Sequence, residues 1–254
     1  MNTGTKSLIL AFFCCYLVIG SVTAARVQLL NASGAPNLPL PNSDTGTSLR
    51  PDIPSPSGGI APPSKTEITG EFMTLALDLK DPGSSHTVNK WARPSVAVGV
   101  TGGPDEPSKE CLAEAITEIN NLTSSVSLYT NDREKPAIEM NFIPLKEFPR
   151  QIKGYVANSE GYTRCESTKG LLQKCTIWVP TTDVTDDLRC TIIRHELTHG
   201  IGLFGHSTHP ESIMYQGTTA TGYSLLDQEV IRLLYNTRIF PGSTEETVRE
   251  YLSE

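Results

Sequence analysis

Positive charge is scarce in this sequence, and the scarcity excludes one broad class of function. Lysine and arginine number 21 against 28 aspartates and glutamates, which gives a net charge of −7. No run of basic residues occurs, so nucleic acid is not an expected partner. The chain has 254 residues, of which 38% are hydrophobic, enough for one folded domain with appendages.

Long hydrophobic runs are also scarce, since a single one (LILAFFCCYLVIG) occurs, near the N-terminus. It follows Lys6 and precedes the small residues Val22, Thr23 and Ala24, which is the layout of a secretory signal peptide. The alternative is a membrane anchor, but the run is shorter than the ~20 residues that a span needs. We therefore expect residues 1–24 to be removed and the protein to be secreted, extracellular or periplasmic, with no membrane attachment afterwards.

Cysteine is sparse, and its spacing favours disulfides over the alternative of a zinc site built on thiolates. Cys14 and Cys15 lie inside the predicted signal peptide, which leaves Cys111, Cys165, Cys175 and Cys190. No two of these four have the close spacing of zinc-binding cysteine pairs. An even number of cysteines in an exported chain predicts two disulfides, and three pairings are open.

The stretch at residues 25–66 lacks the apolar residues that a core needs. It is rich in proline, serine, glycine and asparagine, so burial cannot offset the entropy of ordering it. We interpret it as a flexible linker, with a removable pro-segment as the alternative. It contains no cysteine that could block a metal site, and the folded domain is then residues 67–254.

Apolar periodicity in the folded part predicts both strands and helices. The expected strands are residues 72–79, 95–100, 137–145 and 171–180. The expected helices are residues 108–122 with Ser108 as N-cap, 181–205 with caps from Thr185, Asp186 and Asp187, and 224–242. This order of elements predicts an α+β domain.

Histidine is rarer still, yet four of the five histidines lie between positions 195 and 209. His195 and His199 are four residues apart, so a helix places both on one face, where they can bind one metal ion. Glu196 is beside the first ligand and can act as a general base. Gly202 permits a positive φ that turns the chain out of the helix, which makes His206 the candidate third ligand. His209 is the rival candidate.

Three neutral imidazoles leave a fourth position open on a zinc ion, as in catalytic rather than structural sites. A water in that position becomes acidic enough to give its proton to Glu196. The predicted cofactor is one catalytic Zn²⁺.

The residues from His195 to Gly202, followed by His206 and by Ser212-Ile213-Met214-Tyr215, resemble the motif of the metzincin zinc metallopeptidases. In that family the third ligand stands six residues after the second histidine, which is Gly205 here, so His206 comes one residue late. A similar longer loop occurs in a poorly characterised group of secreted bacterial metzincin-like domains.

The resemblance implies a zincin domain with a mixed twisted sheet, a zinc-ligand helix and a C-terminal helix. It implies that Met214 packs beneath the ligands and that an edge strand, for which residues 172–179 are the candidate, binds an extended substrate. Disulfides at Cys175 and Cys190 would stiffen the frame between that strand and the zinc helix. Tyr215 and Tyr223 are candidates to stabilise an oxyanion. A specificity pocket is expected near residues 218–223.

The predicted function is therefore a secreted zinc-dependent endopeptidase, a monomer that acts on protein or peptide substrates. The alternative is a weakly active or inactive secreted binding domain that keeps zinc for stability. A third hypothesis is a zinc-free structural domain with vestigial histidines.

Overall fold

The computed structural model describes residues 61–79, 84–131 and 135–253. The predicted signal peptide and nearly all of the predicted linker lie outside the described residues. The elements are α1 (Lys65–Leu77), β1 (Ser95–Thr101), α2 (Glu106–Leu122), β2 (Ser127–Thr130), β3 (Ile138–Ile143), a 3-10 helix η1 (Leu145–Glu147), α3 (Phe148–Gln151), β4 (Tyr162–Thr168), β5 (Leu171–Pro180), α4 (Asp186–Gly200), α5 (Leu225–Leu234) and α6 (Glu245–Ser253). These elements confirm the predicted combination of helices with a mixed sheet.

The five strands form one mixed sheet in the order β2-β1-β3-β5-β4. β1, β2, β3 and β5 pair in parallel, and β4 alone runs antiparallel, beside β5. Lys169 and Gly170 join β4 to β5 with φ angles of 52° and 77°, as in a type I′ hairpin turn. Residues 172–179 therefore lie inside the sheet, and the prediction that they form its edge is wrong. The sheet has β2 at one edge and, next to β5, β4 at the other, and the polar residues of β4 gave no clear strand pattern in the sequence.

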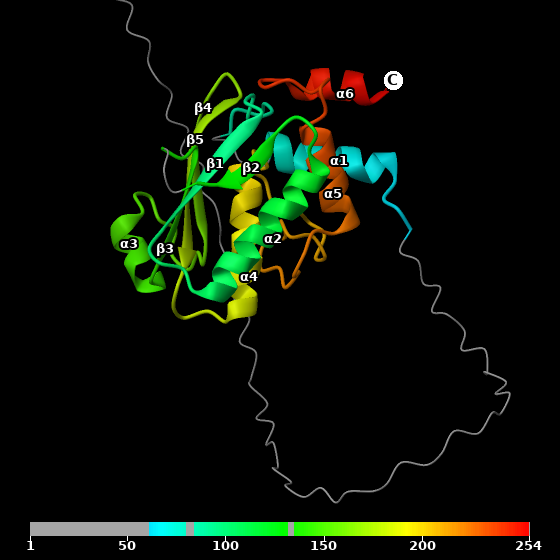
Figure 1. Ribbon diagram of the computed structural model, residues 1–254. Helices are drawn as coiled ribbons and strands as arrows, with labels where there is room; N and C mark the ends of the chain where they lie inside the picture. The colour runs from blue at the N-terminus through cyan, green and yellow to red at the C-terminus, as the bar shows by residue number, and fades with distance from the viewer. Residues whose placement is uncertain (1–60, 80–83, 132–134, 254) are drawn as a thin grey trace, which may run out of the picture. The chain divides into compact units, whose positions relative to one another are not determined.

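Helices α2 and α4 cover one face of the sheet (Figure 1). Alternate residues of β3 and β5 point into the core between them, namely Ile138, Met140 and Phe142 with Cys175, Ile177 and Val179. The opposite face is more polar and carries an ion pair of 2.8 Å between Lys174 and Glu139. At one end of that face α3 supplies Phe148 to a small second cluster with Tyr162 and Trp178.

Residues 72–79 do not form the expected strand, because residues 65–77 are the helix α1. Ser64 and Glu67 form a reciprocal capping box at its start, a signal that the apolar alternation concealed. Phe72, Leu75 and the neighbouring apolar side chains are buried, and α1 packs against α5. Tertiary packing thus favours the helix here.

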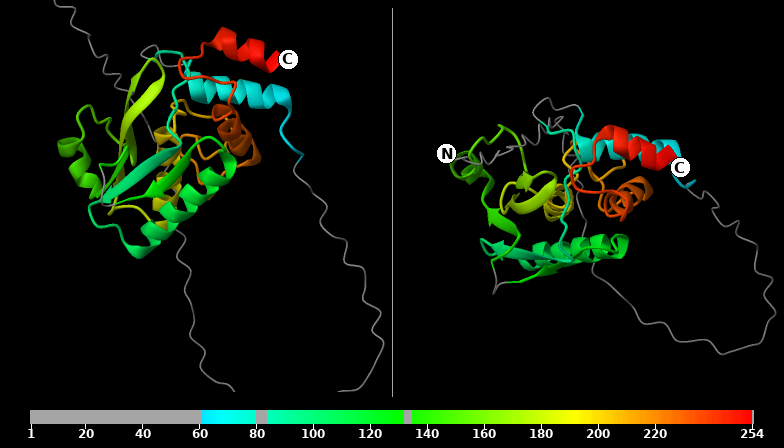
Figure 2. Two further views of the ribbon diagram at one scale, coloured as in Figure 1. Left: turned by 45° about the horizontal axis from the view of Figure 1, so that its top comes forward. Right: turned by 90° about the horizontal axis from the view of Figure 1, so that it is seen from above.

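The other predicted helices are present with different ends. α2 starts earlier than expected, because Asp105 rather than Ser108 is its N-cap and accepts a hydrogen bond from the Ser108 backbone. α4 has Thr185 as its N-cap, as predicted, and stops at Gly200. The C-terminal helix α6, which lies along α1 (Figure 2), was missed because Val248 is its only fully buried apolar residue. None of the described helices is both long and apolar enough to span a bilayer.

Two disulfides settle which of the three pairings forms. Cys111–Cys190 joins α2 to α4, and Cys165–Cys175 joins directly opposed residues of β4 and β5. We expected disulfides at Cys175 and Cys190 to stiffen the frame between the strand and the helix with the histidines. Instead, one disulfide links two helices and the other links two strands.

Candidate metal centre

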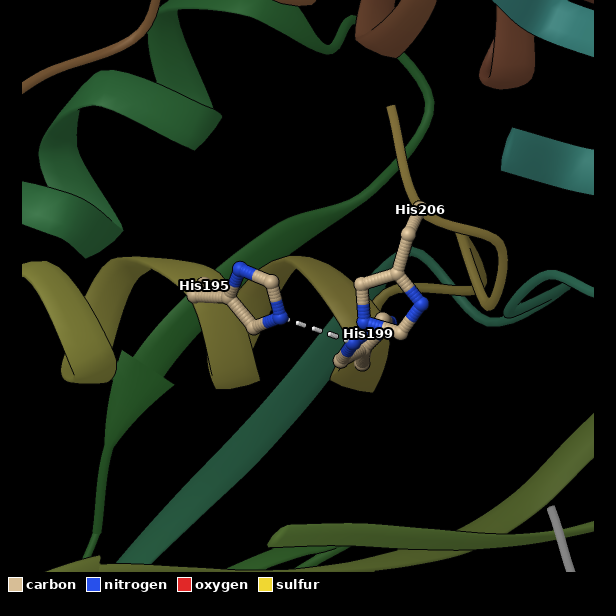
Figure 3. A group of neighbouring side chains, drawn as sticks. All are labelled: His195, His199 and His206. Carbon is tan, nitrogen blue, oxygen red and sulfur yellow. Dashed lines mark hydrogen bonds between the residues drawn. The ribbon is translucent and has the colours of Figure 1, made fainter. Parts of the chain in front are cut away.

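Helix α4 presents His195 and His199 on one face, one turn apart. Both side chains are buried, and their Nε2 atoms approach to 3.1 Å (dashed line in Figure 3). The Nδ1 atom of His195 lies 2.7 Å from the Ile213 carbonyl oxygen, and that of His199 lies 2.6 Å from the Leu203 carbonyl oxygen. A proton on each Nδ1 is donated to these carbonyls, so each Nε2 keeps a lone pair for a metal ion.

The chain after α4 turns sharply and returns to the two histidines. Gly202 has φ of 116°, and a Cβ there would lie 2.0 Å from the Asn89 carbonyl oxygen. A Cβ on Gly205 would lie 2.0 Å from the Thr74 carbonyl oxygen, and the Gly205 backbone donates to the Leu75 carbonyl of α1. Only glycine fits at position 205, which explains why the next residue is the one available as a ligand.

His206 points back to the other two imidazoles, as Figure 3 shows. Its ring centroid lies 5.3 Å from that of His195 and 5.0 Å from that of His199. One nitrogen from each ring lies within 4.8 Å of the others. Three imidazole donors grouped in this way fit one divalent cation, and zinc accepts such a set.

The rival His209 is not part of this group. Its Nε2 lies 3.8 Å from a carboxylate oxygen of Glu71, and its Nδ1 lies 3.7 Å from one of Glu211. The structure therefore brings His206, and not His209, to the helix histidines.

Glu196 is buried beside His195 and touches the edge strand. The Thr163 hydroxyl lies 2.6 Å from Glu196 Oε2 and 3.1 Å from the Glu196 carbonyl oxygen. A Cβ on Gly161 would lie 2.4 Å from Glu196 Oε1, so the backbone at position 161 passes directly over the carboxylate. Neither Thr163 nor Gly161 is predicted from the sequence, because no local pattern links residues so far apart in the chain, 33 positions for Thr163 and Glu196.

A small, largely apolar pocket opens beside His195 and Glu196. Its other lining residues are Gly161, Leu188, Thr191, Ile192, Tyr215, Gly217 and Thr218. The expectation of a pocket near residues 218–223 thus agrees with the structure at Thr218. The remaining walls come from α4, from Gly161 before β4, and from Tyr215 and Gly217 in the segment after Met214.

The segment with the predicted methionine turn is held by one buried carboxylate. Asp227 accepts hydrogen bonds from the Ser212 hydroxyl and from the Ile213 backbone, the latter at 3.0 Å. Met214 is fully buried, and its carbonyl accepts a hydrogen bond of 2.9 Å from the Ser207 backbone. The carbonyl that orients His195 and the loop that carries His206 are therefore fixed to each other.

The two candidate tyrosines lie in different places. Tyr215 lines the pocket beside His195 and Glu196. The Tyr223 hydroxyl lies 3.0 Å from Thr198 Oγ1, and burial raises the pKa of this tyrosine. Tyr223 is not among the residues that line the pocket.

Comparison with known proteins gives a family and two similar structures. A family model described as "Protein of unknown function (DUF2927)" matches residues 65–254. One structure of myroilysin is 14% identical, with 59% of this chain and 83% of that chain covered and a TM-score of 0.40. Another is 14% identical, with 68% and 96% covered and a TM-score of 0.41. The search of curated proteins finds no match.

Proposed function

Because the chain belongs to the DUF2927 family, whose description assigns no activity, we propose a function from its own residues: a zinc-dependent peptidase that hydrolyses peptide bonds. One observation carries the proposal. The imidazoles of His195, His199 and His206 converge, and the buried carboxylate of Glu196 lies next to them on α4.

The three histidines would hold one Zn²⁺ through ring nitrogens that the carbonyls of Ile213 and Leu203 help to orient. Bound zinc supplies Lewis-acid chemistry, since it polarises a carbonyl and makes a water molecule more acidic. The resemblance to the metzincin motif supports this assignment.

Glu196 would then act as general base and afterwards as general acid. It accepts a proton from the attacking water as the oxygen bonds to the peptide carbonyl carbon. It delivers this proton to the leaving nitrogen as the carbon–nitrogen bond breaks, which yields a carboxylic acid and an amine. Because Glu196 lies next to His195, the proton transfer would take place beside the metal ion that polarises the substrate carbonyl.

The substrate would be an extended peptide that pairs with β4. Within the described residues β4 ends the sheet, so its outer backbone groups face no other strand. The pocket beside Glu196 is small and bounded by Leu188, Ile192 and Thr218. We expect a preference for a short apolar side chain next to the cleaved bond.

Export fits this function. Two disulfides are typical of proteins that fold outside the reducing cytosol. The proposal is thus a secreted peptidase with the centre on α4.

The test compares the wild-type protein with Glu196→Ala and Glu211→Ala, each loaded with zinc. Peptide cleavage should fall by about 10²–10⁴-fold in Glu196→Ala, because a general base contributes about that factor. Zinc content, measured by atomic emission, should not change. Glu211 is an exposed carboxylate in the same region and serves as the matched control.

Wild-type protein that binds zinc and cleaves no peptide in a broad library would contradict the proposal. That result, with a zinc-dependent melting temperature, would favour the alternative of a zinc-stabilised binding domain.

A further inference from the structure

At the start of β4, Thr163 contacts one oxygen of the proposed general base, and the backbone of the preceding Gly161 lies close to the other. The Thr163 side chain is 3% exposed and its hydroxyl lies 2.6 Å from Glu196 Oε2. On the other side, Gly161 leaves no space for a Cβ next to Oε1 or next to the Ile192 side chain. Gly161 and Thr163 therefore confine the carboxylate that α4 carries.

A hydroxyl has one proton, so it can donate to only one of the two acceptors near it. The distance of 2.6 Å to the carboxylate is shorter than the 3.1 Å to the Glu196 carbonyl, and a charged acceptor forms the stronger bond. The carboxylate consequently has one oxygen fixed by Thr163. This bond limits rotation of the group and orients its second oxygen.

We infer that Thr163 is the positioning residue for Glu196, and that Gly161 is required because any side chain there would displace the carboxylate. The inference rests on the proposed function. Thr163 does not itself move a proton in the reaction. It holds the base in one orientation, and misplacing a catalytic group by about 1 Å can reduce a rate by about 10²-fold.

The test uses Thr163→Val, which keeps the shape and removes the hydroxyl, and Thr163→Ser, which keeps the hydroxyl and removes the methyl group. We expect kcat of Thr163→Val to fall about tenfold to hundredfold, with KM within about twofold of wild type. Thr163→Ser should recover most of the loss. Gly161→Ala should resemble Thr163→Val.

Thr123→Val is the matched control, because Thr123 is a half-buried threonine at the end of α2 whose hydroxyl lies 2.8 Å from the Val126 carbonyl oxygen, away from the candidate centre. This variant should lose stability and keep kcat. A purely structural role for Thr163 would instead make both valine variants behave alike.

A second readout does not need turnover. Acetohydroxamic acid bound to the zinc-loaded protein presents a polar hydrogen to a neighbouring carboxylate. Its affinity, measured by calorimetry, should fall about threefold to tenfold in Thr163→Val, the range that one hydrogen bond gives, and recover in Thr163→Ser.

Equal kcat and equal hydroxamate affinity in Thr163→Val and wild type would overturn the inference, as would equal losses in the valine and serine variants. If no variant cleaves peptide but the hydroxamate affinities differ as stated, the proposed function fails and the positioning role stands.

Discussion

At the scale of single residues, the site separates two histidines that the sequence places three positions apart. Gly205 packs so closely against the backbone of α1 that only glycine fits at this position. The next residue, His206, turns back toward His199 on α4. His209 faces Glu71 and Glu211 instead. Backbone packing, and not the type of side chain, decides which histidine joins His195 and His199.

His206→Ala should therefore weaken zinc binding by at least about 10²-fold, because one of three protein donors is lost and second-layer changes alone cost about 10–100-fold. His209→Ala should leave the zinc affinity within about threefold of wild type. Competition with a chromophoric chelator measures both. Equal weakening in the two variants would contradict the choice of ligand.

Lys90 is a buried cation held by backbone oxygens. Its Nζ donates 2.7 Å to the Leu234 and Ile239 carbonyls, and burial lowers the pKa of Lys90 to about 8. An unfolded lysine has a pKa of about 10.4, so between these values the unfolded chain binds more protons than the folded one. The free-energy cost of burying the charge is fully present below pH 8. It disappears as the pH rises above the pKa of the unfolded lysine.

The free energy of unfolding of the wild type, relative to that of Lys90→Met, should therefore increase between pH 7.5 and pH 10. Urea unfolding of both proteins at the two pH values measures the difference. Parallel pH dependence of the two proteins would show that Lys90 keeps its proton throughout this range.

At the scale of elements, α5 and the methionine turn depend on one carboxylate. Asp227 closes the capping box of α5 with Ser224, and the same side chain holds Ser212 and the Ile213 backbone. It is 2% exposed, so its loss leaves several buried donors without an acceptor. The same side chain therefore stabilises the start of α5 and the segment whose Ile213 carbonyl orients His195.

Asp227→Ala should lower the free energy of unfolding by about 3 kcal/mol, since hydrogen bonds to buried charged groups contribute about 1.5–3 kcal/mol. Glu67→Ala, which removes the same position of the exposed capping box of α1, should cost less than about 1 kcal/mol. Chemical denaturation compares the two. Similar losses in the free energy of unfolding would mean that the contacts between Asp227 and the methionine turn add no stability beyond the helix cap.

At the scale of the whole molecule, covalent and ionic links hold α2 against α4. Arg194, next to His195, lies 3.0 Å from carboxylate oxygens of both Glu114 and Glu118, and Cys111–Cys190 joins the same two helices. This disulfide spans 79 residues, whereas Cys165–Cys175 spans 10. Constraint of the unfolded chain grows with the length of the closed loop.

The variant Cys111→Ala/Cys190→Ala should therefore lose more stability than Cys165→Ala/Cys175→Ala, by about 4.5 against about 3 kcal/mol in the chain-entropy model. Zinc content should change less than stability in both. Thermal unfolding with metal analysis tests the order. The reverse order would show that strain or unfolded-state structure outweighs loop length.

The sequence by itself determined which side chains could form a metal centre. The four-residue spacing of His195 and His199 fixes their common face through local helix geometry, and Glu196 follows from the same turn. The α+β class, three of the helices and the number of disulfides also follow from patterns within short windows. The capping box at Ser64 was equally local, and only the apolar alternation of residues 72–79 hid it.

Only the tertiary structure decided the rest, because the contacts concerned join residues far apart in the chain. Packing decided the cysteine pairs and made β4 an edge strand. It also packed Gly205 against α1, so that His206 returns to α4, and it brought Thr163 to Glu196. Periodicity reports which face of an element is buried, but it carries no information about which partner buries it. Local sequence therefore supplies the side chains of the candidate centre, and tertiary packing arranges them.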